Sequence, residues 1–285
     1  MKFSLSAGER KIDLSSPVCM GIINVTPDSF SDGSELASKG SQFSIDLDRV
    51  LFKAESLIAE GATIIDIGGE STRPGASPIS DEEELQRVIP AIEVIKNNLD
   101  VCISVDTSSP IVMSEAISAG VGLINDVRAF SKLGALEVAI KSNAALCLTH
   151  MQGQPMNMQE SFQYTDLLSD VFNFLKGRIK AFSKTGVLES RLVIDPGFGF
   201  GKSLEHNYQI LKHLSVFEGL NLPILVGISR KSMIGDVVGH PVKERVYGSV
   251  AATVLALNNG ASIIRTHDVA ATMDAIRVHS IYQRV

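Results

Sequence analysis

The stretch AEGATIIDIGGEST, residues 59–72, contains the pattern that decides the fold. A helical segment ends at Gly61, an apolar run follows at 63–67, and polar residues begin again at Glu70. An apolar run this short, with isoleucine on both faces, is typical of a buried parallel strand. Because parallel strands need a crossover between them, the stretch predicts a repeating unit of strand and helix.

The same unit recurs along the chain. Eight apolar runs of strand length lie at 18–25, 63–67, 101–105, 122–124, 144–148, 192–194, 224–228 and 262–264. Segments with helical periodicity follow them at 45–59, 82–95, 110–119, 133–141, 167–182, 204–214, 243–257 and 270–281. Eight units in 285 residues predict a single-domain (β/α)8 TIM barrel over 18–285, with a doubly wound open sheet as the structural alternative. We expect residues 1–17 to form a short N-terminal extension, a hairpin at the barrel bottom.

The composition disfavours a nucleic-acid-binding protein and a membrane-anchored protein. The chain carries 26 basic and 32 acidic side chains, a net charge of −6, and no block of Lys and Arg, which disfavours a nucleic-acid partner. Its apolar runs are too short for a membrane span, and the first residues lack a signal-peptide pattern, so we expect no membrane anchor. The three cysteines lie in apolar runs without metal-ligand spacing, which indicates reduced thiols in a cytoplasmic protein.

Polar residues are concentrated after the predicted strands, where barrel enzymes carry their active sites. Carboxylates and an amide follow the third, fourth and sixth strands, at Asp106, Asn125 and Asp195. Cations follow the second, seventh and eighth strands, at Arg73, Arg230, Lys231, Arg265 and His267. Taken singly, an aspartate after a strand is more often a helix cap than a catalyst. Eight polar ends that converge on one mouth predict instead an acidic floor beside a cationic edge, which suits a heterocycle that carries phosphates.

Two apparent motifs are discounted. The run GFGFGKS at 197–203 has three residues, not four, between the flanking glycines of a P-loop, and it does not match G-x-G-x-x-G. We therefore expect a flexible loop whose phenylalanines cover a pocket. The six histidines include no pair at metal-ligand spacing, which disfavours a zinc centre.

Five segments at the strand ends form a recognisable set. They are MGIINVTPDSFSDG (20–33), DIGGESTRPG (66–75), DPGFGFGK (195–202), GISRKSMIG (227–235) and RTHDV (265–269). Together they resemble the dihydropteroate synthase family, from about residue 18 to the C-terminus. The resemblance implies a homodimeric barrel enzyme that requires Mg²⁺ and is inhibited by sulfonamides at its p-aminobenzoate site. Its reaction would join 6-hydroxymethyl-7,8-dihydropterin pyrophosphate to p-aminobenzoate, giving 7,8-dihydropteroate and pyrophosphate in folate biosynthesis.

The resemblance also implies roles for individual residues. The pterin contacts would be Asp106, Asn125, Asp195, Lys231 and Arg265. The pyrophosphate contacts would be Asn24, Arg73, Arg265 and His267, and Asn24 would also be a Mg²⁺ ligand. The p-aminobenzoate contacts would be Thr72, Pro74, Phe200 and Ser232. The residues with catalytic roles would be Arg73, Lys231, Arg265 and His267.

The chemistry of these substrates predicts an SN1-like displacement. The departing pyrophosphate leaves a cation that is delocalised into the dihydropterin ring, and the neutral aniline nitrogen needs no base. The loops at 26–40 and 71–80 are rich in Gly, Ser, Pro and Asp, and we expect them to act as lids that exclude water. In the first of them a serine follows Gly33 where the family has a second glycine, so a second Mg²⁺ ligand from Asp28 or Asp32 stays open.

Two other functions compete with this reading. A pterin-binding methyltransferase-type barrel would share the acidic floor but lack the residues at 72–74 and 229–231. A catalytically silent pterin-binding homologue would lose the residues that hold the leaving group. Because both sets are present, the sequence predicts a synthase with small-molecule substrates.

Overall fold

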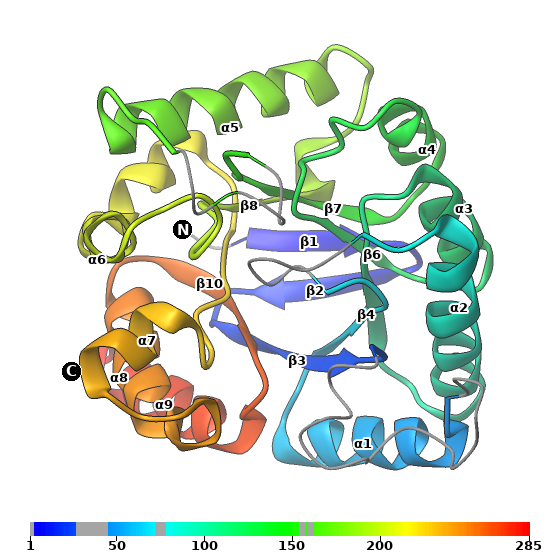
Figure 1. Ribbon diagram of the computed structural model, residues 1–285, viewed down its shortest axis with the longest axis horizontal. Helices are drawn as coiled ribbons and strands as arrows, with labels where there is room; N and C mark the ends of the chain where they lie inside the picture. The colour runs from blue at the N-terminus through cyan, green and yellow to red at the C-terminus, as the bar shows by residue number, and fades with distance from the viewer. Residues whose placement is uncertain (1–2, 27–44, 72–77, 154–157, 159–161) are drawn as a thin grey trace.

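The computed structural model describes residues 3–26, 45–71, 78–153, 158 and 162–285, and within them the chain forms a closed parallel barrel (Figure 1). The order around the barrel is β10 (Ala261–Thr266), β3 (Val18–Asn24), β4 (Ile64–Gly68), β5 (Cys102–Asp106), β6 (Leu123–Asp126), β7 (Ala145–Thr149), β8 (Leu192–Asp195) and β9 (Ile224–Val226). Because β10 pairs with both β3 and β9, the sheet has no edge and is not an open one. The predicted TIM barrel is confirmed.

Helices cover the outside of the barrel (Figure 1). They are α1 (Leu47–Glu60), α2 (Asp81–Asn98), α3 (Pro110–Ser118), α4 (Ala135–Lys141), α5 (Leu167–Ser183), α6 (Leu204–Lys212), α7 (Ser232–Val238), α8 (Val246–Asn258) and α9 (Val269–Tyr282). Short 3-10 turns lie at η2 (Glu189–Arg191), η3 (Leu214–Leu220) and η4 (Val242–Glu244). Side-chain oxygens of Asp46, Ser80, Ser109 and Ser203 accept a hydrogen bond from the backbone N–H three residues on, which fixes where these helices begin.

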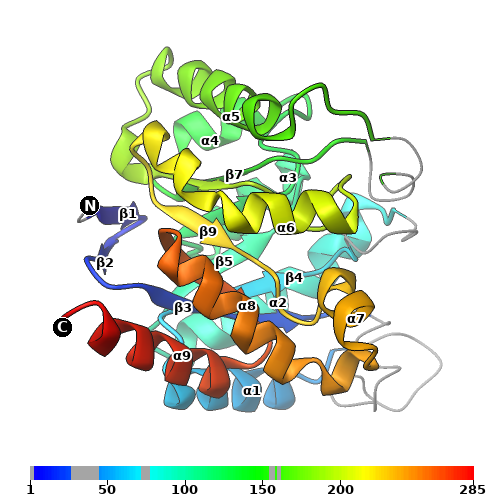
Figure 2. The ribbon, with the colours of Figure 1, turned by 90° about the vertical axis from the view of Figure 1, so that its left-hand side faces the viewer.

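The segment between β9 and β10 differs from the prediction of a single helix at 243–257. It contains α7, then η4, then α8. Gly239 ends α7 in the left-handed region at φ 72°, and Pro241 follows two residues later, so a new helix has to begin beyond them. The short α7 lies at the end of the barrel opposite the chain's N-terminal hairpin (Figure 2).

The N-terminal hairpin closes the bottom of the barrel. β1 (Phe3–Ala7) and β2 (Arg10–Leu14) pair in antiparallel fashion, joined by a turn at Gly8. Their buried side chains pack against the inward-facing residues at the start of the barrel strands, among them Met20 and Ile263. The hairpin therefore seals the apolar lower end of the barrel and leaves its upper end for polar groups.

The polar layer of the barrel follows from the strand register. Asp66 lies opposite Ser104, and Asp106 lies opposite Asn125. Asp195 at the end of β8 pairs in register with Thr149 on β7. Since alternate residues of each strand face inward, these polar side chains project into the barrel above the apolar layer.

Cys19, Cys102 and Cys147 are buried free thiols. Burial raises the pKa of the Cys102 thiol to about 11 and that of Cys19 to about 12, so both stay protonated. Among the described residues, no helix combines the length and apolarity needed to cross a bilayer.

Candidate active site

The floor of the site is made by three buried polar side chains at or near the ends of β5, β6 and β8. Asp106, Asn125 and Asp195 are 7%, 3% and 6% exposed. Burial raises the pKa of Asp106 to about 7, although the nearby Arg265 lowers it. Burial also raises the pKa of Asp195, against the opposing effect of Lys231. Two carboxylates and an amide in one barrel mouth can accept hydrogen bonds from a flat ring with several N–H groups.

Arg265 connects this floor to a residue that the sequence interpretation did not assign. Its Nε donates to Asp66 Oδ2 at 2.6 Å, and its Nη2 donates to Asp106 Oδ2 at 2.8 Å. The two carboxylates raise the pKa of the guanidinium although burial lowers it. The guanidinium is therefore held in one orientation by two charge-assisted hydrogen bonds.

Asp66 is fully buried and organises three neighbours. Besides Arg265, it accepts a hydrogen bond of 2.5 Å from Ser104 Oγ and one of 3.4 Å from Asn125 Nδ2. It therefore positions both a residue of the floor and the cation above it. The sequence did contain a sign of this role, because an aspartate interrupts an otherwise apolar strand between Ile65 and Ile67.

Lys231 stands at the end of the loop that follows β9. Its Nζ donates to Phe198 O at 2.5 Å and lies 4.4 Å from the centroid of the Phe200 ring. Burial lowers the pKa of Lys231 to about 8, while Asp195 raises it. The ammonium group therefore faces the acidic floor and one aromatic wall at once.

The cationic edge includes His267, which packs against the loop after β9. Ser229 Oγ accepts from the backbone N–H of His267 at 3.2 Å and lies 3.2 Å from its Nδ1. A hydroxyl that donates to Nδ1 leaves Nε2–H to donate elsewhere. In the same two loops, the guanidinium of Arg230 forms a two-pronged ion pair with Asp268, which joins the ends of β9 and β10.

The glycine-rich segment 197–201 is more fixed than the sequence suggested. Gly197 N–H donates to Asp195 Oδ1 at 2.7 Å, and Gly199 N–H donates to Asn207 Oδ1 at 2.7 Å. The prediction that both phenylalanines cover a pocket is wrong for Phe198, which is fully buried in the main core. Phe200 alone lies at the site, in a small cluster with Val127 and Met158.

Two predicted site residues lie at the edge of this arrangement. Asn24 ends β3, and its Oδ1 lies next to Gly68, at the mouth of the barrel. Ser232 is exposed and opens α7 directly after Lys231. Thr72, Arg73 and Pro74, together with Asp28 and Asp32, lie outside the described residues. So do most of the two predicted lid loops.

Asn24 fits a Mg²⁺ ligand by its chemistry. Mg²⁺ prefers hard oxygen donors and is often held by one or two protein groups, waters and substrate phosphates. The amide oxygen of Asn24 is such a donor, and Asn24 ends the strand that pairs with β10, which carries Arg265. In the part of the chain that the structure describes, no group of three His, Cys, Asp or Glu side chains could hold a metal, so a site built entirely from the protein is not found there.

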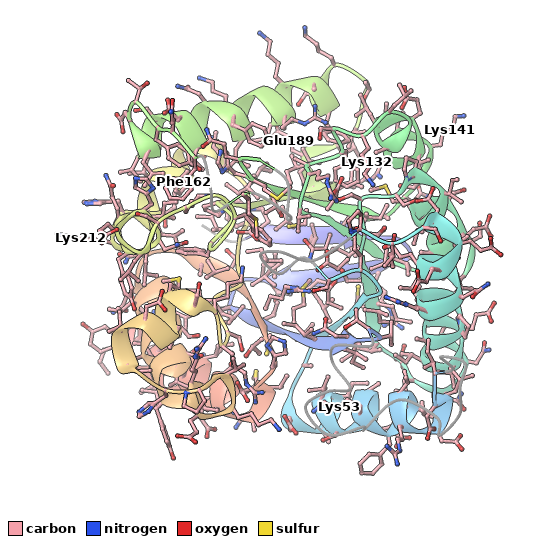
Figure 3. The ribbon with its side chains drawn as sticks, viewed as in Figure 1. Lys53, Lys132, Lys141, Phe162, Glu189 and Lys212 are labelled. Atoms are coloured by element: carbon pink, nitrogen blue, oxygen red, sulfur yellow. The ribbon has the colours of Figure 1, made fainter. Side chains whose placement is uncertain are left out.

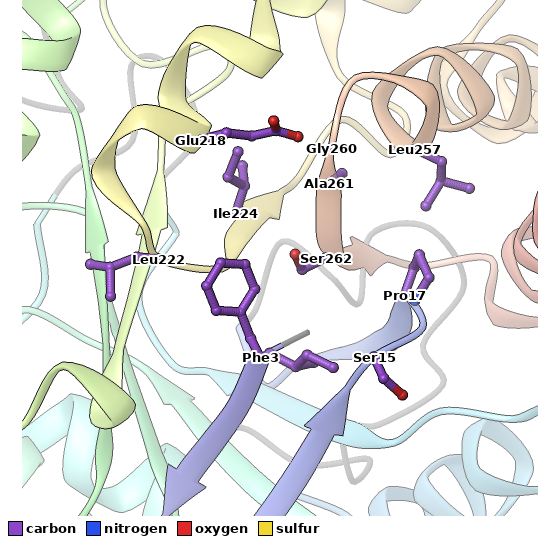
Figure 4. A pocket seen from close by; sticks show the side chains of 11 residues that line it. Phe3, Ser15, Pro17, Glu218, Leu222, Ile224, Leu257, Gly260, Ala261 and Ser262 are labelled. Carbon is purple, nitrogen blue, oxygen red and sulfur yellow. The ribbon is translucent and has the colours of Figure 1, made fainter. Parts of the chain in front are cut away.

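A separate cavity of about 170 Å³ lies at the opposite, hairpin end of the barrel (Figure 4). Its walls include Phe3, Pro17, Glu218, Ile224 and Leu257. None of the floor or edge residues lines it, so it is not part of the candidate active site.

Comparisons with known proteins agree with this geometry. A family model described as pterin binding enzyme matches residues 20–267. The dihydropteroate synthase of Escherichia coli strain K12 is 50% identical over 274 residues, which is 96% of this chain and 94% of that protein.

Solved structures are similar as well. The Yersinia pestis dihydropteroate synthase in complex with a sulfonamide drug gives a TM-score of 0.93 at 48% identity, over 99% of this chain and 100% of that one. The Xanthomonas albilineans dihydropteroate synthase with 4-aminobenzoic acid gives a TM-score of 0.91 at 43% identity, over the whole of both chains.

Proposed function

Because this chain belongs to the pterin binding enzyme family, and to its dihydropteroate synthases, we propose that it condenses 6-hydroxymethyl-7,8-dihydropterin pyrophosphate with p-aminobenzoate. The products are 7,8-dihydropteroate and pyrophosphate. The observation that carries the proposal is one barrel mouth in which the acidic floor of Asp106, Asn125 and Asp195 lies next to two cations, with Arg265 bonded to Asp106 and Lys231 close to Asp195.

The floor binds the pterin ring. The ring presents a 2-amino group and a ring N–H side by side, and a carboxylate accepts this pair of hydrogen bonds. The amide of Asn125 complements the remaining edge, and the Lys231 ammonium, which faces Asp195, donates to the ring carbonyl. A hydrogen bond to a charged group contributes about 1.5–3 kcal/mol, so loss of either carboxylate weakens pterin binding by at least about tenfold.

The cationic edge stabilises the departing pyrophosphate. Arg265 and His267 lie at the end of β10, and Arg73 is assigned to the same group by the family resemblance. When bound, Mg²⁺ would neutralise diphosphate charge, with Asn24 as its ligand from the protein. Arg265 also connects the cationic edge to the acidic floor, because it donates hydrogen bonds to Asp66 and Asp106.

The displacement is dissociative. Negative charge leaves with the pyrophosphate towards the cationic edge, while Asp106 and Asp195 stabilise the cation that is delocalised in the ring. The aniline nitrogen of p-aminobenzoate carries its lone pair at neutral pH, so the protein only has to position it. Phe200 provides a wall for that ring, and the N-terminus of α7 at Ser232 lies beside it. Sulfonamides are expected to compete for this position.

The direct test follows pyrophosphate release from the dihydropterin substrate with Mg²⁺, in the presence and absence of p-aminobenzoate. We expect release that depends on p-aminobenzoate and equals dihydropteroate formed. Release without p-aminobenzoate would indicate a hydrolase instead. Binding of the pterin with no release under either condition would indicate a silent pterin-binding protein.

We also propose that the chain works as a homodimer in the cytoplasm. Large apolar side chains are exposed on the neighbouring helices α8 and α9: Tyr247, Leu255, Val278, Ile281 and Tyr282. Exposed apolar groups gathered in this way commonly mark a protein interface. The three free, buried cysteines suit a reducing compartment.

Light scattering after gel filtration tests the dimer. Val278→Asp on this face should give a monomer, whereas Leu133→Asp, at a side chain that is 97% exposed on another part of the barrel, should not change the mass. A wild-type monomer at micromolar concentration would contradict the proposal.

A further inference from the structure

Lys202 is a buried lysine with no role in the site described so far. Its side chain is 2% exposed and follows directly on the glycine-rich segment 197–201, just before α6 begins. Burial lowers the pKa of Lys202 to about 7, and the neighbouring Asp195 acts against this by favouring the charged form. A buried ammonium group is costly unless several acceptors surround it.

Four acceptors surround the Lys202 Nζ, and they come from two different loops. The loop after β8 supplies Gly197 O at 2.8 Å and Phe200 O at 3.1 Å. The loop after β7 supplies His150 Nδ1 at 2.9 Å and His150 O at 3.4 Å. An ammonium group has three N–H donors, so each of them has a partner in this cage.

His150 is held as an acceptor by its surroundings. Burial and, to a smaller extent, the Lys202 charge lower the pKa of His150 to about 2, so the imidazole is neutral. The ring packs edge-on against Phe174 with centroids 5.0 Å apart, which fixes its orientation. Because an ammonium group can only donate, the Nδ1 that lies 2.9 Å from Nζ is the acceptor of this pair.

The loop that precedes Lys202 has an unusual backbone conformation. Gly197, Gly199 and Gly201 all have positive φ, at 78°, 78° and 62°. A Cβ on Gly197 would lie 1.8 Å from His150 O, so the two loops touch at backbone level. Buried carbonyl groups that converge in this way need a hydrogen-bond donor between them, and Lys202 Nζ is that donor.

The same loop forms the aromatic wall of the site. The ring of Phe200 lies against the Lys231 ammonium, and the carbonyl of Phe198 accepts a hydrogen bond from it. The bond from Lys202 to Phe200 O fixes the backbone of the residue that carries this ring. We propose that Lys202 is a positioning residue that ties the loops after β7 and β8 together and thereby places the Phe200 ring for p-aminobenzoate. This inference rests on the proposed function for the identity of the second substrate, but not for the loop contact itself.

Two measurements on Lys202→Met test it, with Lys212→Met as the matched control. Methionine keeps most of the apolar stem and removes the charge and the donors. Lys212 is exposed on α6, at the outer edge of the molecule (Figure 3). Hydrogen exchange of the ligand-free protein should become at least about tenfold faster in 197–201 and 150–153, the effect of losing one charge-assisted hydrogen bond. Lys212→Met should exchange like the wild type.

Steady-state kinetics give the second measurement. In Lys202→Met the KM for p-aminobenzoate should rise at least about tenfold, while the dissociation constant of the dihydropterin substrate changes less than twofold. Unchanged loop exchange, or equal losses for both substrates, would overturn the proposal. If Lys202→Met does not fold, Lys202→Arg replaces it, because arginine keeps the charge with altered geometry. Lys202→Arg should raise the KM for p-aminobenzoate more than the dissociation constant of the dihydropterin substrate, by a smaller factor than Lys202→Met. Equal effects on the two substrates would count against the proposal. A wild type that makes no dihydropteroate would refute the proposed function, and the exchange experiment would still decide the role of Lys202.

Discussion

Asp66→Asn is the substitution whose effect the structure predicts most sharply. Asp66 is fully buried and holds Arg265 at 2.6 Å, Ser104 at 2.5 Å and Asn125 at 3.4 Å. Removing one partner of a buried ion pair costs about 3–5 kcal/mol of folding free energy. Because Arg265 keeps its bond to Asp106 and asparagine keeps one acceptor oxygen, we expect the lower end, about 3 kcal/mol. Turnover should fall by at least about tenfold, since a less restrained Arg265 stabilises the departing diphosphate less well.

Urea unfolding followed by circular dichroism measures the first effect, since the chain contains no tryptophan to report by fluorescence. Asp274→Asn is the matched control, because Asp274 pairs with Arg277 at 3.2 Å on the surface, where both side chains are largely exposed. The control should have no measurable effect on stability or turnover. An Asp66→Asn protein that unfolds within about 1 kcal/mol of the wild type and keeps full turnover would refute the role assigned to Asp66.

Three further predictions concern other groups. Glu84 is buried, and its Oε1 has no hydrogen-bond partner in the described part of the chain. Burial raises the pKa of Glu84 from 4.5 to about 7, so the folded state binds the proton more tightly than the unfolded state does. The free energy of unfolding should therefore fall as the pH rises from about 4.5 through 7. Glu84→Gln should therefore raise the unfolding free energy at pH 8 by up to about 3 kcal/mol and flatten its pH profile, and urea titrations at pH 5 and pH 8 would show no gain if this is wrong. Arg73→Ala should reduce kcat far more than pterin affinity, because its assigned partner is the leaving group; equal losses in kinetics and in equilibrium binding would contradict that assignment. Chelation by EDTA should abolish turnover and Mg²⁺ should restore it, whereas full activity in EDTA would remove the metal from the account.

The fold could be predicted because every unit of the barrel repeats the same local pattern. A strand that is apolar on both faces, such as 63–67, has to be covered on both sides, and a parallel sheet surrounded by helices provides this cover. The helical periodicity did not predict α7, the first helix between β9 and β10, because α7 has only seven residues, too few for a clear pattern, and a left-handed glycine ends it.

The site was predicted less completely, for physical reasons. Carboxylates after strands, such as Asp106 and Asp195, stand out because polar side chains collect there in barrels. Asp66 lies inside its strand, and its importance depends on Arg265, which comes 199 residues later in the chain. Lys202 belongs to a glycine-rich run that resembles a P-loop without its spacing, so the sequence suggested no role for it. Only the three-dimensional structure shows that two loops surround its ammonium group.

The most direct measurement is a crystal structure of this protein with a pterin and pyrophosphate bound together. The account predicts that the pterin edge lies within hydrogen-bond distance of Asp106, Asn125 and Asp195, with the pyrophosphate against Arg265 and His267. A pterin bound elsewhere, or a pyrophosphate out of reach of both cations, would contradict it.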